Sequence, residues 1–429
     1  MRKRLSWGAV LSLLIIVVAV TVCVTMLVAM RRFNAQVNEL SNRQSMYNYI
    51  SDVDNAVRQH YYGTIDEEVL RRAIASGQVK GLGDKYAKYF TTEQYSAWLE
   101  QMSGQSTGFG LEIALDEKGQ VVLSAVQQGS TAYSAGLQKG DVVTALNKAS
   151  LGEDPLATLQ AALDANQPLI LTIRRDGQET AFELSASAYT RVSVDSSLIE
   201  TTGLIRIKAI TDATPDQLKA AYSSLKEKGA TELVLDLRGV EAGSPEAAKR
   251  ILSFLLPYGL YGYYTDGDKT TELRAEESTQ LDVPTAVLVN KKTAGEAELI
   301  AAALKQAGKA QLVGNGTAGR SLVQDCYSLA SDNAAVYITV GEFLLLNKSG
   351  WEGQGLTPDV EASLTEEQEK VWELILPEYD PQFQAAVGAL KGTTTTEPTT
   401  TTTTEVTTTT TVAEGETTTA EGETTTTAS

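Results

Sequence analysis

Residues 286–306, AVLVNKKTAGEAELIAAALKQ, have the pattern of a buried strand, a turn and a helix. Many α/β enzymes place a nucleophile at such a junction. The tip of this one, TAGEAE, contains neither serine nor cysteine. Thr293 and Glu296 instead fit a capping box, in which the threonine caps the helix and the glutamate reaches back to the N–H group of the cap. On this interpretation Gly295 lies in the first turn of an ordinary helix.

The chain contains one histidine, His60. A Ser-His-Asp triad would have to use it, and a zinc site with two histidines is excluded. His60 lies in a helical stretch well before the α/β region, so we expect it at a helix end or on the surface. The sequence predicts no metal site and no cofactor.

The 429 residues carry a formal net charge of −18, which argues against nucleic acid as a partner. Residues 5–30 are uncharged and long enough to span a membrane. A cleaved signal peptide is the alternative, but its apolar region is normally about 7–15 residues long and is followed by a small-residue cleavage site. Arg31 and Arg32 follow here instead. We therefore expect residues 1–33 to form a cytoplasmic stub and a single-pass anchor, with the body outside the cytoplasm of a bacterial cell, at its surface.

The remaining pattern predicts an α+β protein of several domains. Residues 34–104 are typical of helices, of which one ends at Gly63. Residues 105–190 contain short alternating runs separated by glycine turns, which indicates a β-rich domain. Strands alternate with helices over 191–380, which predicts an α/β core with a largely parallel sheet. The Thr-rich segment 393–429 is expected to be disordered; outside a cell it could be glycosylated, pass through the cell wall, or be an inert tail.

Several motifs occur in a defined order along the chain. They are GLGDKYAKYFTTEQY (81–95), TGFGLEI (107–113), GSTAYSAGLQKGDVVTALN (129–147), ELVLDLR (232–238), VLVN (287–290), VGNGTAGRSLVQ (313–324) and GLTPDV (355–360). From about residue 56 to 362 the chain resembles the carboxyl-terminal processing (tail-specific) serine peptidases. In that family a helical region precedes a PDZ domain and an α/β peptidase core. Thr131 stands where the family usually has proline.

The TGFGLEI segment looks like the carboxylate-binding loop of a PDZ domain. The resemblance implies that backbone N–H groups from Gly108, Phe109, Gly110 and Leu111 converge on the terminal carboxylate of a peptide. The peptide would add as a strand, with Leu111 and Ile113 lining its groove. The implied partners are protein or peptide C-termini. Because the family often self-associates, a homo-oligomer or an active peptidase relative is also an implied partner.

The resemblance breaks at the catalytic positions. The family uses a serine nucleophile and a lysine base, which a glutamine assists. The ungapped match places Gly295 at the serine, Arg320 at the lysine and Gln324 at the glutamine. Glycine has no side chain to attack with, and arginine keeps its proton. The family's L-D-L-R-N-x-x-G-G, which helps to form the oxyanion hole, reads LDLRGVEAG over 235–243, where Glu241 would disfavour a developing negative charge.

The sequence therefore predicts a membrane-anchored pseudopeptidase that binds C-termini and scaffolds or regulates partners. The alternative is an active serine-type peptidase using displaced residues. Thr293 lies two positions before Gly295 and follows two lysines that we expect to be exposed in the turn. Ser321 has no predicted base beside it. A wall-spanning structural protein is a third possibility. Arg320 could hold a carboxylate, either that of Glu296 or that of a bound peptide.

Overall fold

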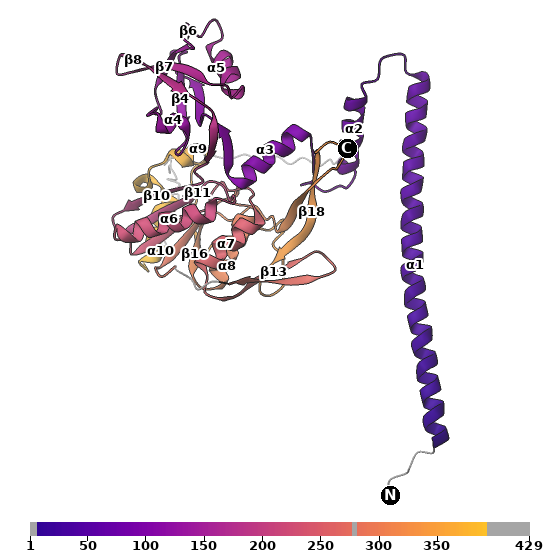
Figure 1. Cartoon of the computed structure of the whole chain (residues 1–429). Coiled ribbons are helices and arrows are strands. Elements are labelled where there is room, and N and C mark those ends of the chain that lie inside the picture. The colour runs from indigo at the N-terminus through magenta and orange to yellow at the C-terminus, as the bar shows by residue number, and fades with distance from the viewer. Residues whose placement is uncertain (1–6, 277–280, 393–429) are drawn as a thin grey trace, which may run out of the picture. The chain divides into compact units, whose positions relative to one another are not determined.

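The computed structural model of the chain describes residues 7–276 and 281–392 (Figure 1). Helices occur beside both parallel and antiparallel sheets in these residues, so the predicted α+β class is confirmed. The Thr-rich segment 393–429, which we expected to be disordered, lies outside the described residues.

The described chain forms two compact units. The smaller unit contains the residues up to 97 together with 324–340. The larger unit contains the remaining described residues. The elements of the smaller unit are α1 (Trp7–His60), α2 (Glu67–Lys80), β1 (Lys88–Phe90), the start of α3 (Thr92–Ser103), and parts of β17 (Leu322–Ser328) and β18 (Ala335–Leu344). Within it, β1 pairs antiparallel with the first residues of β18.

Helix α1 contains the apolar N-terminal stretch and extends well beyond it. Its segment Ile16–Asn34 is long and apolar enough to cross a membrane, a property that a membrane anchor and a signal sequence share. The helix runs unbroken to His60, three residues before the predicted end at Gly63, and His60 is exposed at that end. At a rise of about 1.5 Å per residue, α1 is about 80 Å long.

The segment 105–190, which we predicted to be β-rich, contains strands β2 to β9 and the helices α4 and α5. Its main sheet has the order β3-β4-β5-β7-β8, with β6 paired to β5, while β2 and β9 form a separate pair. The bounds are β2 (Gln105–Gly108), β3 (Leu111–Leu115), β4 (Val121–Val126), α4 (Thr131–Ser134), β5 (Val142–Leu146), β6 (Ala149–Ser150), α5 (Pro155–Asp164), β7 (Leu169–Arg175), β8 (Gln178–Leu184) and β9 (Ser187–Thr190). Leu123, Leu159 and Leu171 are fully buried in its core. Strand β3 is therefore an edge strand of a well-packed sheet.

The α/β core contains a six-stranded sheet in the order β10-β11-β12-β15-β16-β19. Strands β10 and β11 are antiparallel, and every other neighbouring pair is parallel, so the largely parallel sheet is confirmed. The bounds are β10 (Val194–Ile199), β11 (Thr202–Ile207), α6 (Thr214–Glu227), β12 (Glu232–Asp236), α7 (Pro245–Leu255), β15 (Thr285–Val289), α8 (Glu296–Gln306), β16 (Ala310–Gly314), β19 (Val360–Glu361) and α10 (Pro381–Leu390). All of β15 and nearly all of β12 are buried, as continuous apolar runs between helices should be.

The sequence did not predict the antiparallel strands of the core. Strands β13 (Gly259–Thr265) and β14 (Thr270–Ala275) form a hairpin, and the last residues of β18 pair with β13. Near the C-terminal end of the described chain lie α9 (Glu366–Val371) and two short 3-10 helices, η1 (Trp372–Leu374) and η2 (Pro377–Tyr379).

A buried ionic network fixes α10 to the carboxyl end of β12. Arg238 donates at 2.8 Å to both Asp236 and Asp380, and also to the amide oxygen of Gln382. These four side chains are at most 3% exposed. The ring of Trp372 lies 4.7 Å from the Arg238 guanidinium and covers it. The network therefore orders the chain where the 239–243 loop begins.

Candidate functional site

The turn between β15 and α8 places Gly295 in a backbone conformation that side chains rarely adopt. Its φ is +60° and its ψ is −121°, and it caps α8, which begins at Glu296. The predicted capping box is therefore wrong. The Thr293 hydroxyl donates instead to the Leu237 carbonyl, at 3.0 Å, and Glu298 accepts the Gly295 N–H group. The turn is not an ordinary helix start, because it keeps a strained, glycine-dependent shape.

Glu298 ties this turn to the loop that carries Arg320. The Glu298 carboxylate is fully buried. Its Oε2 atom accepts the N–H groups of Gly295, at 3.1 Å, and Arg320, at 2.8 Å. Its Oε1 atom accepts the Gly319 N–H group, at 2.8 Å, and the Thr317 hydroxyl. One carboxylate thus brings together two residues that are 25 positions apart in sequence.

Sequence reasoning missed the role of Glu298. Its available signal was its place in the first turn of α8, three residues after the capping Gly295, where a glutamate can accept the N–H group of the cap. The sequence favours Glu296 instead, because it stands at the same spacing from Thr293.

The loop 239–243 approaches Gly295 with an acceptor atom. A Cβ atom built on Gly295 would lie 3.9 Å from the backbone carbonyl oxygen of Glu241. The same oxygen accepts from Nη1 of Arg320, at 3.4 Å. The Glu241 side chain itself is exposed. The N–H group of Gly243, the last glycine of the loop, donates at 2.9 Å to the Glu296 carboxylate. An oxyanion needs N–H donors, whereas the Glu241 carbonyl faces Gly295 and the Gly243 N–H group is bonded to Glu296.

Glu296 is a buried carboxyl group at the start of α8. Loss of hydration raises its pKa above the ordinary value, and this effect outweighs the hydrogen bond from Gly243 and the attraction of Arg320. This attraction has the sign expected for the predicted pairing of Arg320 with Glu296, which stays a prediction.

The predicted catalytic positions are distributed over both compact units. Gly295 and Arg320 lie in the larger unit, where Glu298 joins their backbones. Gln324 belongs to the smaller unit, where its side-chain amide donates to the Thr339 hydroxyl at 3.2 Å. Neither a glycine nor an arginine supplies a nucleophile or a base.

Two hydroxyl groups near this turn are buried and hydrogen-bonded. Thr293 is 0% exposed and accepts the Asn290 N–H group while it donates to the Leu237 carbonyl. Ser321 is also 0% exposed and donates to the Glu342 carboxylate at 2.6 Å. The expectation that Ser321 lacks a base beside it is therefore wrong, because Glu342 is a potential proton acceptor.

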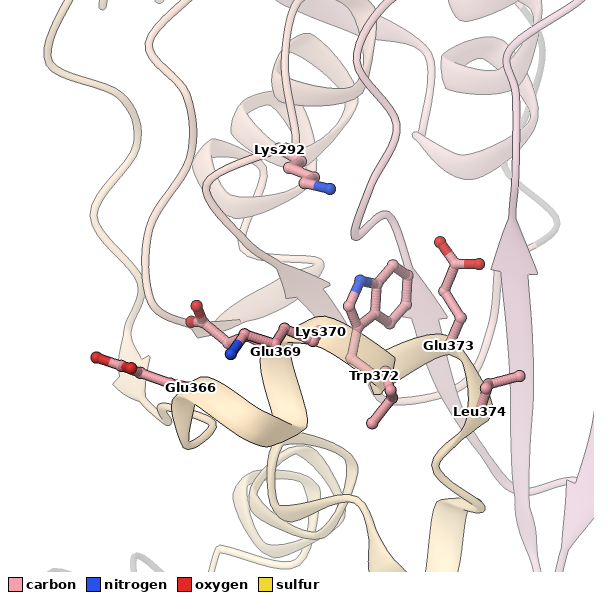
Figure 2. Close-up of a pocket in the computed structure, with 8 residues that line it drawn as sticks. Lys292, Glu366, Glu369, Lys370, Trp372, Glu373 and Leu374 are labelled. Atoms are coloured by element: carbon pink, nitrogen blue, oxygen red, sulfur yellow. The ribbon is translucent and has the colours of Figure 1, made fainter.

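A pocket of about 780 Å³ lies beside the same turn (Figure 2). Figure 2 shows Lys292 on one side and the α9 residues on the other, with the ring of Trp372, the first residue of η1, between them. The residues lining the pocket are Lys292, Glu366, Glu369, Lys370, Val371, Trp372, Glu373 and Leu374. Three carboxylates and two ammonium groups give it nearly balanced charge, so it favours no single ionic ligand.

The second candidate site is the loop before β3. Gly110 has φ +75°, and a Cβ atom built on it would lie 2.1 Å from the Ser130 side chain, so only glycine fits. The Phe109 side chain is buried in the domain core, so Phe109 can contribute only its backbone groups to a site at the loop. Leu111 and Ile113 are half-buried against the same core. Gly108 lies close to the side chain of Asn166, which follows α5.

Comparison with known proteins identifies both domains. Residues 201–362 match Peptidase family S41, and residues 122–175 match the PDZ domain. The Carboxy-terminal processing protease CtpA of Bacillus subtilis (strain 168) is 26% identical over 340 residues, which cover 76% of this chain and 70% of that protein. A "Probable CtpA-like serine protease" of Staphylococcus aureus (strain N315) is 28% identical over 368 residues, covering 84% and 73%.

Among solved structures, the photosystem II D1 C-terminal processing protease aligns with 72% of this chain and 86% of its own, at 21% identity and a TM-score of 0.43. The homologues are named as proteases, and the S41 match covers the turn at Gly295 and the loop at Arg320. The chain is therefore a homologue of the carboxyl-terminal processing proteases, with a PDZ domain followed by a domain of peptidase family S41.

Proposed function

We propose that this chain is a pseudopeptidase, which binds protein C-termini through its PDZ domain and scaffolds or regulates its partners without cleaving peptide bonds. The observation that carries the proposal is the tip of the strand–turn–helix junction. A glycine stands there, and Glu298 joins its backbone to that of an arginine in the position expected of the base. Neither residue can perform the step that its position requires.

The surroundings of Gly295 support the same proposal. The nearest atom to a side chain at this position would be a carbonyl oxygen, which repels an oxyanion. The N–H group of Gly243 is bonded to Glu296. A restored nucleophile would therefore face a carbonyl oxygen, and Gly243 could donate to the developing charge only if Glu296 moved away.

An active peptidase with displaced residues is the second candidate. The contact between Ser321 and Glu342 is the observation that favours it, because a carboxylate can accept a proton from a hydroxyl. Burial counts against it, since Ser321 is 0% exposed and a substrate carbonyl has to approach within about 3–3.5 Å. Thr293 is buried in the same way.

Tail binding is proposed from the PDZ domain. Strand β3 is an edge strand, so one side of its backbone can accept a further strand. The loop that precedes β3 depends on Gly110 for its shape, and we expect its successive backbone N–H groups to face the same end of the strand. Gly108, Phe109, Gly110 and Leu111 would hold the terminal carboxylate, and Ile113 would line the groove with Leu111.

We further propose that the apolar part of α1 is an uncleaved anchor and that the body lies outside the cytoplasm. An uncharged stretch longer than that of a usual signal peptide, followed by Arg31 and Arg32 instead of a small-residue cleavage site, supports an anchor over a cleaved signal. The partner that this membrane-anchored chain regulates without cleaving peptides would be a second copy or an active peptidase relative.

Binding of a free carboxyl terminus tests the proposal. The full-length chain, kept in solution by a mild detergent, is titrated against a fluorescent decapeptide and its C-terminally amidated twin, with anisotropy as the readout. We expect amidation to weaken binding at least about tenfold, because it removes the charge that the loop N–H groups stabilise. Equal binding of the two peptides, or fragments appearing in the samples, would contradict the proposal.

A further inference from the structure

Strand β3 presents chemically different side chains on its two faces. Leu111 and Ile113 are half-buried and pack against the domain core. Glu112, between them, is exposed, and the alternation along β3 places it on the opposite face, since the register shift after Glu112 adds a residue to β4 and none to β3. The Gln127 side-chain amide donates to its carboxylate at 2.9 Å, which holds the carboxylate beside the strand.

The register of a bound tail follows from the loop and the strand. A carboxylate held by the N–H groups that end at Leu111 puts the terminal residue beside Leu111. An antiparallel tail then places its penultimate residue opposite Glu112. Because side chains alternate between faces, the terminal side chain enters the apolar groove, while the penultimate side chain lies on the Glu112 face. Directly opposite residues in such a pair have Cβ atoms about 4.5–5.5 Å apart.

We propose that Glu112 makes this PDZ domain select tails with a lysine or arginine at the penultimate position. The inference rests on the proposed tail binding and adds the class of tail that is bound. A cation opposite Glu112 forms a cross-strand ion pair, whereas an acidic residue there is repelled. For an exposed pair we expect a preference of about two- to fivefold for lysine over alanine, and a similar discrimination against glutamate.

Three decapeptides that differ only at the penultimate residue (lysine, alanine or glutamate) test the inference on the full-length chain in detergent. An amidated lysine peptide is the fourth probe. Glu112→Gln should abolish the preference while leaving the affinity for the alanine peptide unchanged. Glu112→Lys should reverse it. Glu183→Gln is the matched control, because Glu183 is also exposed and lies on β8 at the other edge of the same sheet.

The outcomes separate this inference from the proposed function. Both are supported if affinity falls in the order lysine, alanine, glutamate, and if this order is lost in Glu112→Gln, reversed in Glu112→Lys and kept in Glu183→Gln. Equal affinity for the three peptides, with binding still lost on amidation, overturns the role of Glu112 and leaves tail binding intact. No carboxylate-dependent binding of any peptide overturns both.

Discussion

Replacing Glu298 by glutamine should destabilise the peptidase-like domain by about 3–5 kcal/mol. The amide can keep its oxygen toward the N–H groups of Gly295 and Arg320, and its NH₂ group then faces Thr317 and Gly319. The Thr317 hydroxyl can turn and accept, but the Gly319 N–H group is left buried without an acceptor, which costs about 1–3 kcal/mol. The two retained bonds lose their charge assistance, at about 1 kcal/mol each.

Urea unfolding followed by tryptophan fluorescence measures this change, because Trp351 and Trp372 are buried in the same domain. Glu227→Gln is the control, since Glu227 is exposed at the end of α6 and should change stability by less than about 0.5 kcal/mol. Tail binding by the PDZ domain should survive in the Glu298 variant. A loss below about 1 kcal/mol in the free energy of unfolding would refute the reasoning, because replacing a buried carboxylate that accepts from four donors should cost more than that.

Three further outcomes are expected. Gly110→Ala should weaken tail binding at least about tenfold in anisotropy titrations, because its methyl group would lie 2.1 Å from the nearest side-chain carbon and its φ is +75°. Asn166→Asp should weaken binding of free-carboxylate peptides, and less so at high salt, because the Asn166 side chain lies beside Gly108; Asn147→Asp, at a similar φ, should not. Glu296→Gln should raise the melting temperature at pH 7 and lose this advantage near pH 4. Burial raises the folded-state pKa of Glu296 above its unfolded-state pKa. Ionisation of Glu296 therefore lowers the stability as the pH rises from the unfolded-state pKa through the folded-state pKa.

The elements that the sequence predicted best are those whose signal is local. The run TELVLDLR became the buried strand β12, and the alternation of strands and helices gave the parallel sheet. The strands of the antiparallel sheet were missed although Asp266-Gly267 lies in the turn of the β13–β14 hairpin, where it is a recognised turn signal. Pairing of β1 with β18 joins residues about 245 positions apart, which no local pattern reveals.

The candidate site shows the same limit. TAGEAE fits a capping template at Thr293, yet Gly295 adopts a left-handed φ and caps the helix itself. Two glutamates in one helical turn could each reach back to the cap. Glu296 turns instead to Gly243, which is 53 positions earlier in the chain. The contact of Ser321 with Glu342 is likewise decided by packing between distant segments rather than by the residues beside Ser321.

The measurement that tests the central claim most directly is peptide-bond cleavage by the full-length chain. An unstructured protein substrate is incubated with the native chain and with Gly295→Ser/Arg320→Lys, and fragments are detected by mass spectrometry. We predict no fragments from the native chain, and a gain of cleavage in the double variant would confirm the two positions. Cleavage by the native chain that disappears in Thr293→Val or Ser321→Ala would contradict the account and establish an active peptidase with displaced residues.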